Sequence, residues 1–538
     1  MTPRFWRRPQ PSILRSGSAR SLAGNAAIVA AAFAASRVLG LVREVVIASR
    51  FGTGHTYDAY VAAFRIPDLI FFIVMSGAFG SAFIPVFGGF LAKGDAERAW
   101  NLANTLLTWV VAGFAVVALL VSLLAKPLIG VVIAPELPAE SQDLAVNLTR
   151  LLLLSPLLLG LSAAGKGMLE AQSAFILPAI APILYNLGII GGALLLTPVM
   201  GVYGLAAGVI LGSLMHVALQ FGSLLRNDLQ LHPSFSPRTD GLAEVGRLMA
   251  PRILGQTVSQ VNLIVMTNFA SRLAEGSISA LNYAQSLILL PHGILAMSLS
   301  TVIFPRMVQD HERGDKKAFR RTLSVGLRTL IFLTLPAAVG LLVYRTSIVQ
   351  MLFQYGSFNE ESTDMVATAV GFFSIGLIGR AVAEPVTRTF YAMRDTRTPV
   401  VVSILSVVVN IALSSALASS MGHAGLALSL SATYLLRMVI LIIILSRRAG
   451  GLISELAPPV TRMLVPLAVF TAVALVAATP LARATNPADG RTLLAYVLFG
   501  LVLVCSMGLY LVTSWLLRLP EAIRLANTAK RRFRGFRD

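Results

Sequence analysis

The stretch AAFAASRVLGLVREVVIASRF, residues 31–51, places Arg37, Arg43 and Glu44 within an otherwise apolar run. A charge at the centre of a bilayer costs roughly 2.5–3.5 kcal/mol on insertion scales, so such residues are usually retained for a purpose. On a helix, Arg37 and Glu44 lie on nearly one face, and Arg43 lies about 100° round from Glu44. A planar guanidinium matches pairs of phosphate oxygens and stays charged when partly desolvated. The pattern indicates a membrane-embedded site for an anionic, phosphorylated substrate.

The following apolar stretches carry a second set of charges. Asp58 and Arg65 are again seven residues apart, and Asp68 follows Arg65 by three. Arg252 lies near the start of a later apolar stretch. Because charged side chains avoid lipid, we expect these residues to face a shared cavity. The predicted substrate-binding residues are Arg37, Arg43, Arg65 and Arg252, with Glu44 and Asp58 as cavity acids.

Structural ion pairs are the alternative interpretation of these charges. Arg37 with Glu44, or Arg65 with Asp68, would then serve to hold helices together. A further group, Arg380, Glu384 and Arg388, recurs every four residues and so lies on one helical face. We take these three as secondary cavity candidates, the alternative being a ladder of ion pairs on the cavity wall.

The sequence offers little for catalysis or metal binding. The single Cys505 lies in an apolar run, so neither an intramolecular disulfide nor a cysteine-based metal site is available. His292 follows Pro291 in an apolar stretch, where a buried structural histidine is commoner than a proton-linked one. No metal-ligand cluster, phosphate loop or nucleophile constellation is found. We therefore expect no enzyme activity, no metal site and no cofactor.

The amino-acid composition indicates that the chain is surrounded by lipid and not by water. Hydrophobic residues make up 56% of the 538 residues, charged residues 13%, and the mean hydropathy is +0.76. These values are far from those of a soluble domain and predict an all-α polytopic membrane protein. The net charge of +19 does not indicate nucleic-acid binding, because basic residues cluster beside apolar spans, as in cytoplasmic segments of membrane proteins.

We predict fourteen membrane-spanning helices. They lie near 22–49, 57–88, 99–125, 145–169, 176–197, 200–224, 245–272, 280–305, 318–345, 364–392, 398–418, 423–446, 460–481 and 491–517. An even number places both termini on one side. Both termini are basic, as are the connections GDKKAFRR, MRDTRTP and SRRAGG, whereas APELPAESQD and SFNEESTD on the other side are acidic. Both termini are therefore predicted to be cytoplasmic. The basic start followed by AAFAAS also resembles a secretory signal, but the apolar pattern continues past the expected cleavage site.

The chain repeats itself at one fixed offset. Ala171 matches Ala392, Pro178 matches Pro399, and GVYGLA from Gly201 matches GHAGLA from Gly422, with the same separation each time. Spans one to six thus pair with seven to twelve, which predicts two pseudo-symmetric six-helix lobes with two C-terminal helices outside the repeat. The predicted parts are a basic N-terminus 1–21, a first lobe 22–224, a second lobe 245–446, two last spans 460–517 and a basic tail 518–538.

Several stretches carry a family resemblance. SRVLGLVREVVIASRFG, DAYVAAFRIPDL, FILPAIAPILYN, LFQYGSFNEEST, FYAMRDTRTPV and GHAGLALS are similar, in this order, to the MurJ (MviN) lipid II flippases of the MOP exporter superfamily. The resemblance covers about residues 22–517. It implies a protein of the bacterial cytoplasmic membrane that moves lipid II, an undecaprenyl-pyrophosphate-linked disaccharide-pentapeptide needed for peptidoglycan, to the outer face by alternating access. It also implies a cationic cavity between the lobes, a groove for the lipid tail by the last two helices, and association with cell-wall synthesis machinery.

The resemblance places Arg37, Arg43 and Arg65 at basic family positions and Glu44 and Asp58 at acidic ones. The chain departs from the family where Phe71 and Phe72 replace basic residues, where Ser76 replaces an acid, and where Ser286 replaces an expected arginine. Arg252 or Arg272 would then supply that charge, or the substrate differs.

The sequence is compatible with three functions. The first is lipid II transport, driven by the membrane potential or by a coupled cation, Na+ or H+. The second is another MOP-type transporter, either a polyprenyl-linked glycan flippase or a drug/cation antiporter. The third is a membrane glycosyltransferase, for which the acidic connections are too short. We favour the first, with lipid II and the membrane as partners and no nucleic acid.

Overall fold

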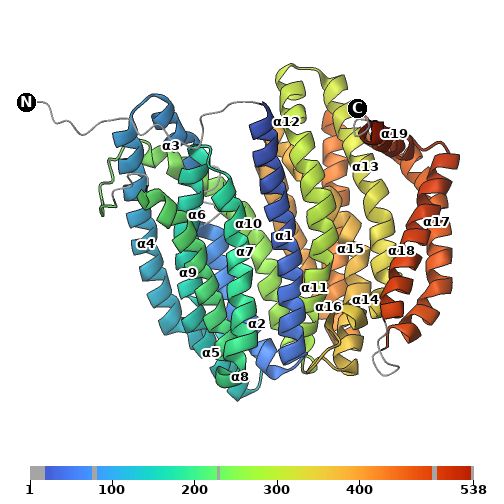
Figure 1. Cartoon of the computed structure of the whole chain (residues 1–538), viewed down its shortest axis with the longest axis horizontal. Helices are drawn as coiled ribbons and strands as arrows, with labels where there is room; N and C mark the ends of the chain where they lie inside the picture. Colours follow the sequence, from blue (N-terminus) through green and yellow to red (C-terminus); the bar gives the residue numbers. More distant parts are fainter. Residues whose placement is uncertain (1–18, 75–81, 227–230, 487–492, 535–538) are drawn as a thin grey trace, which may run out of the picture.

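The computed structural model describes residues 19–74, 82–226, 231–486 and 493–534 (Figure 1). The described residues form helices and contain no strand. This is the expected outcome for so apolar a chain, because a bilayer offers the backbone no partners and a helix satisfies its own N–H and C=O groups. The all-α membrane architecture predicted from the sequence is confirmed.

Nine helices build the first half of the described chain. They are α1 (Ala19–Phe51), α2 (His55–Val74), α3 (Phe83–Ala92), α4 (Ala96–Pro127), α5 (Ala139–Leu152), α6 (Leu154–Ala171), α7 (Ile176–Gly191), α8 (Thr197–Met200) and α9 (Val202–Arg226). Two π-helical turns, η2 (Leu128–Ile133) and η3 (Gly192–Leu196), extend α4 and α7. The predicted span 57–88 corresponds to α2 and α3, which flank residues 75–81 outside the described part.

The second half begins at α10 and ends at α16. Its helices are α10 (Leu242–Ala270), α11 (Ser277–Pro291), α12 (Ser298–Glu312), α13 (Lys316–Val343), α14 (Arg345–Phe353), α15 (Glu360–Ala392) and α16 (Arg397–Ala449), with the π-helical turn η4 (His292–Met297) between α11 and α12. The helices α17 (Leu452–Ala484), α18 (Leu493–Leu516) and α19 (Pro520–Arg534) follow at one edge of the molecule (Figure 1).

Ten helical stretches of the described residues are long and apolar enough to cross a membrane. One of them, Arg397–Arg448, contains Gly422 with φ +57° and ψ −139°, a non-helical conformation that separates the two spans predicted at 398–418 and 423–446. The charged helices α1, α2 and α10 are not among the ten. The exact number of fourteen stays a prediction.

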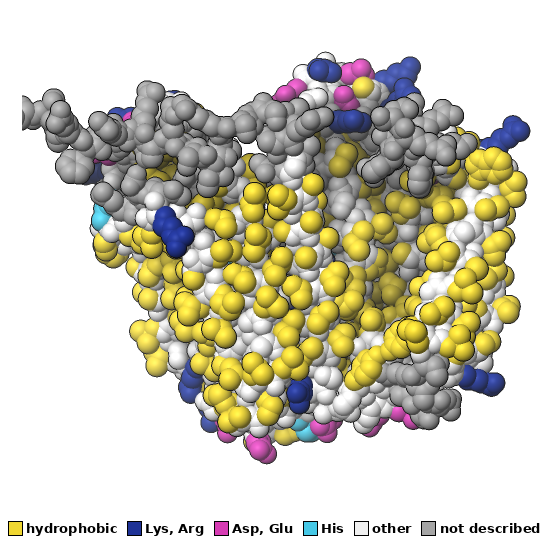
Figure 2. Space-filling model, in the orientation of Figure 1, with side chains coloured by type: hydrophobic (Ala, Val, Ile, Leu, Met, Phe, Trp, Pro, Cys, Tyr) yellow, Lys and Arg dark blue, Asp and Glu magenta, His cyan; other side chains and the backbone are white. Residues whose placement is uncertain are grey.

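A broad apolar belt covers the face of the molecule that Figure 2 shows. Figure 2 shows hydrophobic side chains over most of the visible height, with charged side chains gathered mainly near the two ends. On α4 the belt includes exposed Val116, Leu119, Leu120 and Leu123. Such a surface would be unfavourable in water and is what a lipid environment selects.

The internal repeat is visible in the backbone. Gly201 has φ +58° and ψ −140°, and Gly422, its counterpart in the repeat, has φ +57° and ψ −139°. This region is essentially restricted to glycine. Ser173 and Arg394, which are related by the same offset, have φ of +63° and +59°. The two halves therefore turn their chains in the same way at matched positions, in agreement with the predicted pseudo-symmetric lobes.

Candidate functional site

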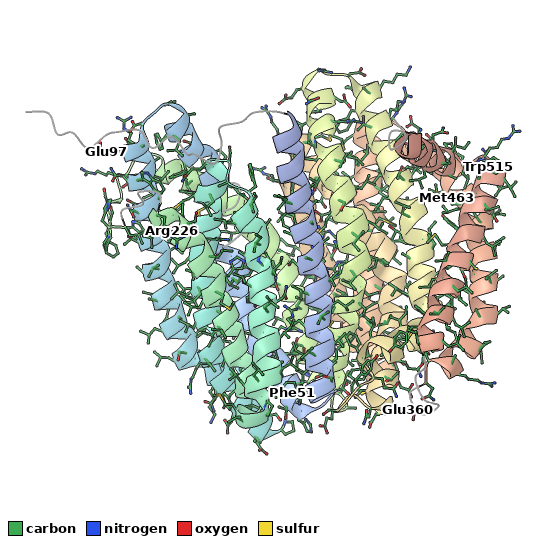
Figure 3. All side chains as sticks on the ribbon, in the orientation of Figure 1. Phe51, Glu97, Arg226, Glu360, Met463 and Trp515 are labelled. Carbon is green, nitrogen blue, oxygen red and sulfur yellow. The ribbon has the colours of Figure 1, made fainter. Side chains whose placement is uncertain are left out.

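The two halves meet at the end of the molecule where α1 finishes and α15 starts. Phe51 and Glu360 mark this end in Figure 3, which lies opposite the start of α1 and α19. The hydroxyls of Thr53 and Ser362 are 2.7 Å apart, and the N–H of Ser357 donates to the carbonyl of Ser49 at 2.8 Å. We call this set of contacts between the halves the clasp, and we include in it the contacts of Asp58 and Tyr57 given below.

Asp58 is the most heavily bonded member of the clasp. Its carboxylate is buried and accepts hydrogen bonds from the N–H of Gly276 at 2.9 Å, the N–H of Ser279 at 2.7 Å and the hydroxyl of Ser279 at 2.5 Å. A carboxylate here satisfies free N–H groups at the start of α11 and interacts favourably with the helix dipole. Asp58 of the first half therefore caps a helix of the second half.

Aromatic rings close the same end. Tyr57 and Tyr283 stack with ring centroids 4.8 Å apart, and the hydroxyl of Tyr283 donates to the carbonyl of Gly52 at 3.2 Å. The amide of Asn282 donates to the hydroxyl of Tyr57 at 3.4 Å. Since these buried rings come from both halves, the clasp combines a tight apolar seal with directional hydrogen bonds.

Arg43 is held by two partners in the first half. One of its terminal nitrogens donates to Oε1 of Glu44 at 2.5 Å, and the other donates to Oδ1 of Asn186 on α7 at 3.2 Å. The amide of Asn186 donates in turn to the carbonyls of Ser36 and Pro182. The second oxygen of Glu44 is buried and has no described partner. Arg43 is thus fixed in direction while keeping an exposed portion.

Arg37 lies earlier on the same helix, and its side chain is exposed. Its guanidinium lies next to Gly293 of η4, in the second half. A Cβ added to that glycine would lie 3.4 Å from the guanidinium carbon of Arg37. No hydrogen bond or ion pair of Arg37 is found among the described residues. Arg37 therefore presents an uncompensated charge between the halves.

Arg65 has a partner that the sequence did not indicate. Its Nε donates to the hydroxyl of Thr267 on α10 at 2.7 Å, and its side chain is buried. Within the described residues no ion pair joins Arg65 to Asp68 or Arg37 to Glu44. The two structural ion pairs considered as alternatives are therefore not formed, and Glu44 pairs with Arg43 instead.

The remaining predicted site residues lie in the second half. Arg252 is part of α10, but its side chain lies outside the described part of the structure. Arg388 pairs with Glu384 at 3.0 Å, and the guanidinium of Arg380 lies 5.4 Å from the ring centroid of Tyr434. His292 is buried and lies within electrostatic reach of Arg380 and Arg37. Of the three secondary candidates, Arg380 thus shares an electrostatic neighbour, His292, with Arg37.

The described residues at which this chain departs from the family pattern make contacts within their own helices. Ser286 donates to the carbonyl of Asn282 in its own helix at 3.1 Å, and Arg272 donates to Oδ1 of Asn268 at 3.1 Å. Phe71 and Phe72 pack edge to face with centroids 5.6 Å apart. Ser76 lies outside the described residues. Nothing in these contacts places a replacement charge at Ser286.

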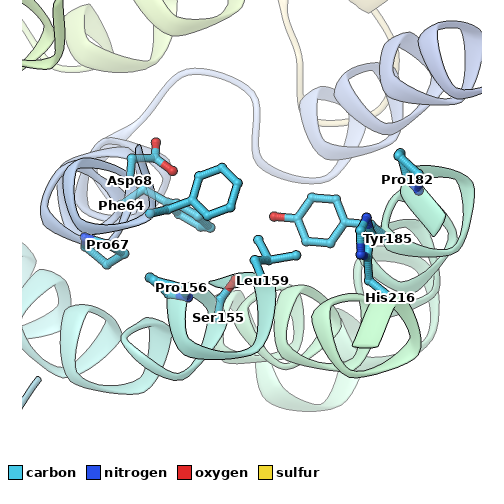
Figure 4. A pocket seen from close by; sticks show the side chains of 10 residues that line it. Phe64, Pro67, Asp68, Ser155, Pro156, Leu159, Pro182, Tyr185 and His216 are labelled. Carbon is cyan, nitrogen blue, oxygen red and sulfur yellow. The ribbon is translucent and has the colours of Figure 1, made fainter. Parts of the chain in front are cut away.

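A pocket of about 250 Å³ opens within the first half, between α2, α6, α7 and α9 (Figure 4). Phe64, Leu159 and Tyr185 supply much of its wall, and Asp68 and His216 are its titratable residues besides Tyr185. The hydroxyl of Tyr185 points into the space (Figure 4). The pocket is mostly apolar.

Sequence reasoning missed two residues that the structure makes prominent. Asn186, which orients Arg43, stands in FILPAIAPILYN, a stretch noted for its family resemblance and not for its amide. Arg437 on α16 has a buried Nε without a described partner. The sequence did contain a sign of Arg437, because it is a single arginine within the apolar run TYLLRMVILII.

The fold and this site define a class of helical membrane protein in which two halves meet at charged side chains. A solved structure titled as an inward-facing multidrug resistance MATE family transporter of the MOP superfamily matches with a TM-score of 0.68, at 14% identity, over 78% of this chain and 95% of that chain. The solved structure of lipid II flippase MurJ in an inward closed conformation matches with a TM-score of 0.73, at 24% identity, over 91% of this chain and 98% of that chain. At these identities the likeness concerns the fold.

Sequence comparison gives the family. The family model described as lipid II flippase MurJ matches residues 47–497. The lipid II flippase MurJ of Burkholderia cenocepacia is 33% identical over 77% of this chain and 81% of its own length. A probable lipid II flippase MurJ of Rhizobium tropici is 28% identical over 90% of this chain and 92% of its own length. The chain belongs to the MurJ family.

Proposed function

We propose that this chain is a lipid II flippase, which moves the pyrophosphate-linked peptidoglycan precursor from the cytoplasmic to the outer face of the inner membrane. Membership of the MurJ family supports the substrate. The observation that carries the mechanism is the exposed, uncompensated guanidinium of Arg37 beside Gly293, on the same helix as the oriented guanidinium of Arg43. In a bilayer such charges are stabilised by an anionic ligand.

Arg37 and Arg43 would bind the pyrophosphate, because two planar forks can pair with several phosphate oxygens at once. Glu44 would lower the positive charge of the empty site by holding Arg43, and the arriving phosphate would compete with it. Arg65 and Arg252 complete the proposed set, with Arg65 donating to Thr267 when substrate is absent. Asp58 would act in the cycle by capping α11, in addition to its proposed role as a cavity acid.

Alternating access requires the clasp to break. The contacts that join the halves at the end near Phe51 keep that end shut, so substrate would enter from the end at which α1 begins. We assign that end to the cytoplasm, which places both termini there. Loss of the Asp58 cap and of the Tyr57–Tyr283 stack would then open the outer end.

Transport would be driven by the membrane potential or by a coupled cation. A potential of 100 mV supplies about 2.3 kcal/mol for each elementary charge moved across the membrane. A coupled cation, Na+ or H+, would add to it. Among the described residues no group of three histidine, cysteine, aspartate or glutamate side chains is arranged to hold a metal ion.

Complementation tests the function. Cells depleted of their own lipid II flippase would receive the wild-type chain, Arg37→Ala, Arg43→Ala, or the control Arg313→Ala, which changes an exposed arginine between α12 and α13. We expect growth with the wild type and the control, and lysis with the other two at equal membrane expression. A wild type that is expressed in the membrane and fails to support growth would contradict lipid II transport.

A drug/cation antiporter is the second candidate, and the pocket in Figure 4 favours it, because aromatic walls beside the carboxylate of Asp68 suit an organic cation. Binding of an aromatic cation that is lost in Asp68→Asn, together with no binding of lipid II, would support this function instead.

A further inference from the structure

The second half contains a charge cluster that pyrophosphate binding by α1 does not explain. It comprises Arg380, Glu384 and Arg388 of α15 and Arg437 of α16. The cluster contains three guanidiniums and one carboxylate, so two positive charges are in excess. Arg388 is paired with Glu384 at 3.0 Å, whereas Arg380 lies over the Tyr434 ring and forms no ion pair with a described residue.

Glycines bring the two helices of the cluster together. A Cβ on Gly379 would lie 2.7 Å from backbone atoms of Tyr434 and Leu435, and one on Gly376 would lie 2.6 Å from the Cα of Ser431. Only residues without a side chain allow helices to approach this closely in a membrane. Arg380 follows directly after the contact on α15, and Arg437 follows three residues after Tyr434 on α16. The close approach therefore places both arginines at one helix crossing.

The crossing lies well inside the membrane-spanning helices. Arg380 is twelve residues before Ala392 at the end of α15, and Arg437 is twelve residues before Ala449 at the end of α16. At 1.5 Å per residue, each is about 18 Å from the end of its helix. The two helix ends lie together, because Arg448 pairs with Asp395 at 2.5 Å. The side chains are too deep to reach the aqueous boundary by extending along the helix.

Donors in the cluster lack partners. The Nε of Arg437 and the hydroxyl of Thr387 are buried and have no hydrogen-bond partner among the described residues. Thr387 is seven residues after Arg380 and therefore lies on the same helical face. A buried charged donor without an acceptor is strongly unfavourable, so a bound acceptor would stabilise this arrangement. The cluster is close to the interface between the halves, since His292 is within electrostatic reach of both Arg380 and Arg37.

We propose that Arg380 and Arg437 form a second anion subsite, which binds a carboxylate of the peptide part of the translocated headgroup while Arg37 and Arg43 bind its pyrophosphate. A carboxylate fits better than a phosphate, because Glu384 lies within electrostatic reach of Arg437 and repels a doubly charged group more strongly. Thr387 supplies a neutral donor to the same oxygens. The inference rests on the proposed function, since it assigns a second part of the same substrate.

Binding to two lipids tests the subsite. The purified full chain in detergent would be titrated with lipid II and with the same lipid lacking its pentapeptide. We expect the wild type to bind lipid II about tenfold more tightly, the difference that one charge-assisted hydrogen bond provides. Arg437→Gln and Arg380→Gln should remove this preference and leave the affinity for the peptide-free lipid within about twofold. Arg313→Gln is the control and should keep the preference.

Thermal unfolding in detergent shows whether each variant is folded. If Arg437→Gln fails to fold, Arg437→Lys replaces it, because lysine keeps the charge without the planar fork and should lose part of the preference. Variants that keep the full preference, or that lose affinity for both lipids equally, would overturn the subsite. A wild type that binds both lipids equally would also overturn it. A wild type that binds neither lipid would instead contradict the proposed transport function.

Discussion

Asp58 and Ser279 are joined by two hydrogen bonds to one carboxylate oxygen, at 2.7 Å from the N–H and 2.5 Å from the hydroxyl of the serine. This relationship links the start of α2 in the first half to the start of α11 in the second. Because the capped N–H groups have no other partner in the helix, the closed end depends on a contact that only the closed arrangement provides.

Removing the cap should open the closed end. Asp58→Ala loses charge-assisted hydrogen bonds, which shifts the balance between closed and open states by about tenfold or more. Spin labels at Arg50→Cys and Glu360→Cys, both exposed at this end, would report the separation of the halves in a Cys505→Ser chain. We expect longer distances in Asp58→Ala and a smaller change in Ser279→Ala, which loses only the hydroxyl. An unchanged distance distribution in Asp58→Ala would show that the clasp does not depend on this cap.

The helix pair α7 and α9 should tolerate no added side chain at its centre. A Cβ on Gly208 would lie 2.8 Å from the Cα of Gly192 and 2.9 Å from the carbonyl oxygen of Gly188. We expect Gly208→Val to destabilise the protein by about 1–3 kcal/mol, the usual cost of overpacking. Gly113→Val is the matched control, because nothing lies within 4 Å of its added Cβ. Equal melting temperatures of the two variants in detergent would contradict the close packing of α7 and α9.

Asp395, in the turn between α15 and α16, should make stability depend on pH. Burial opposes its ionisation, but hydrogen bonds from Thr398 and the ion pair with Arg448 outweigh this and lower its pKa to about 2. Because the pKa is depressed in the folded protein, the stabilisation is fully present above the unfolded pKa, near 4, and is lost as the pH falls through the folded value. We expect Asp395→Asn to cost on the order of 1–2 kcal/mol at pH 7.

Melting temperatures between pH 7 and pH 3 would check this expectation. The difference between the wild type and Asp395→Asn should shrink as the pH falls below 4. A difference that stays constant over this range would mean that the charge of Asp395 contributes nothing.

Asn186 should act on transport through Arg43. Its amide oxygen accepts a hydrogen bond from Arg43 at 3.2 Å, and its amide nitrogen is held by two backbone carbonyls. We expect Asn186→Ala to slow lipid II transport by about three- to tenfold, less than Arg43→Ala, because the charge remains but its direction is no longer fixed. Asn186→Gln and Asn186→Asp should differ in their rates of lipid II transport, because the aspartate would add a second acid beside Arg43. Wild-type transport in Asn186→Ala would rule out the orienting role.

The sequence predicted the helical architecture well, because apolar runs and turn residues are local signals. The motifs that reveal the repeat are local as well, and the matching conformations of Gly201 and Gly422 follow from them. The partners of the charges could not be predicted in the same way. The contact of Arg65 with Thr267 and the cap of Asp58 on α11 join distant parts of the chain.

Helical spacing alone also gave an incomplete account of Glu44. Its position on the same face as Arg37 suggested a pair, yet the long side chain of the adjacent Arg43 reaches it around the helix. Arg437 was visible in the sequence as a lone charge, but its significance depends on the close approach of α15 and α16, which glycines at 376 and 379 permit.

Transport of lipid II by purified protein tests the central claim most directly. Liposomes containing fluorescent lipid II would be treated with a membrane-impermeant quencher, with and without a membrane potential, for the wild type, Arg37→Ala, Arg43→Ala and Arg313→Ala. We predict that the wild type and Arg313→Ala expose the inner-leaflet lipid rapidly, and that the other two variants are at least tenfold slower. If the fluorescence is quenched with Arg43→Ala at the wild-type rate, transport through the arginine site would be contradicted. Quenching with the wild type that is no faster than in empty liposomes would contradict it as well.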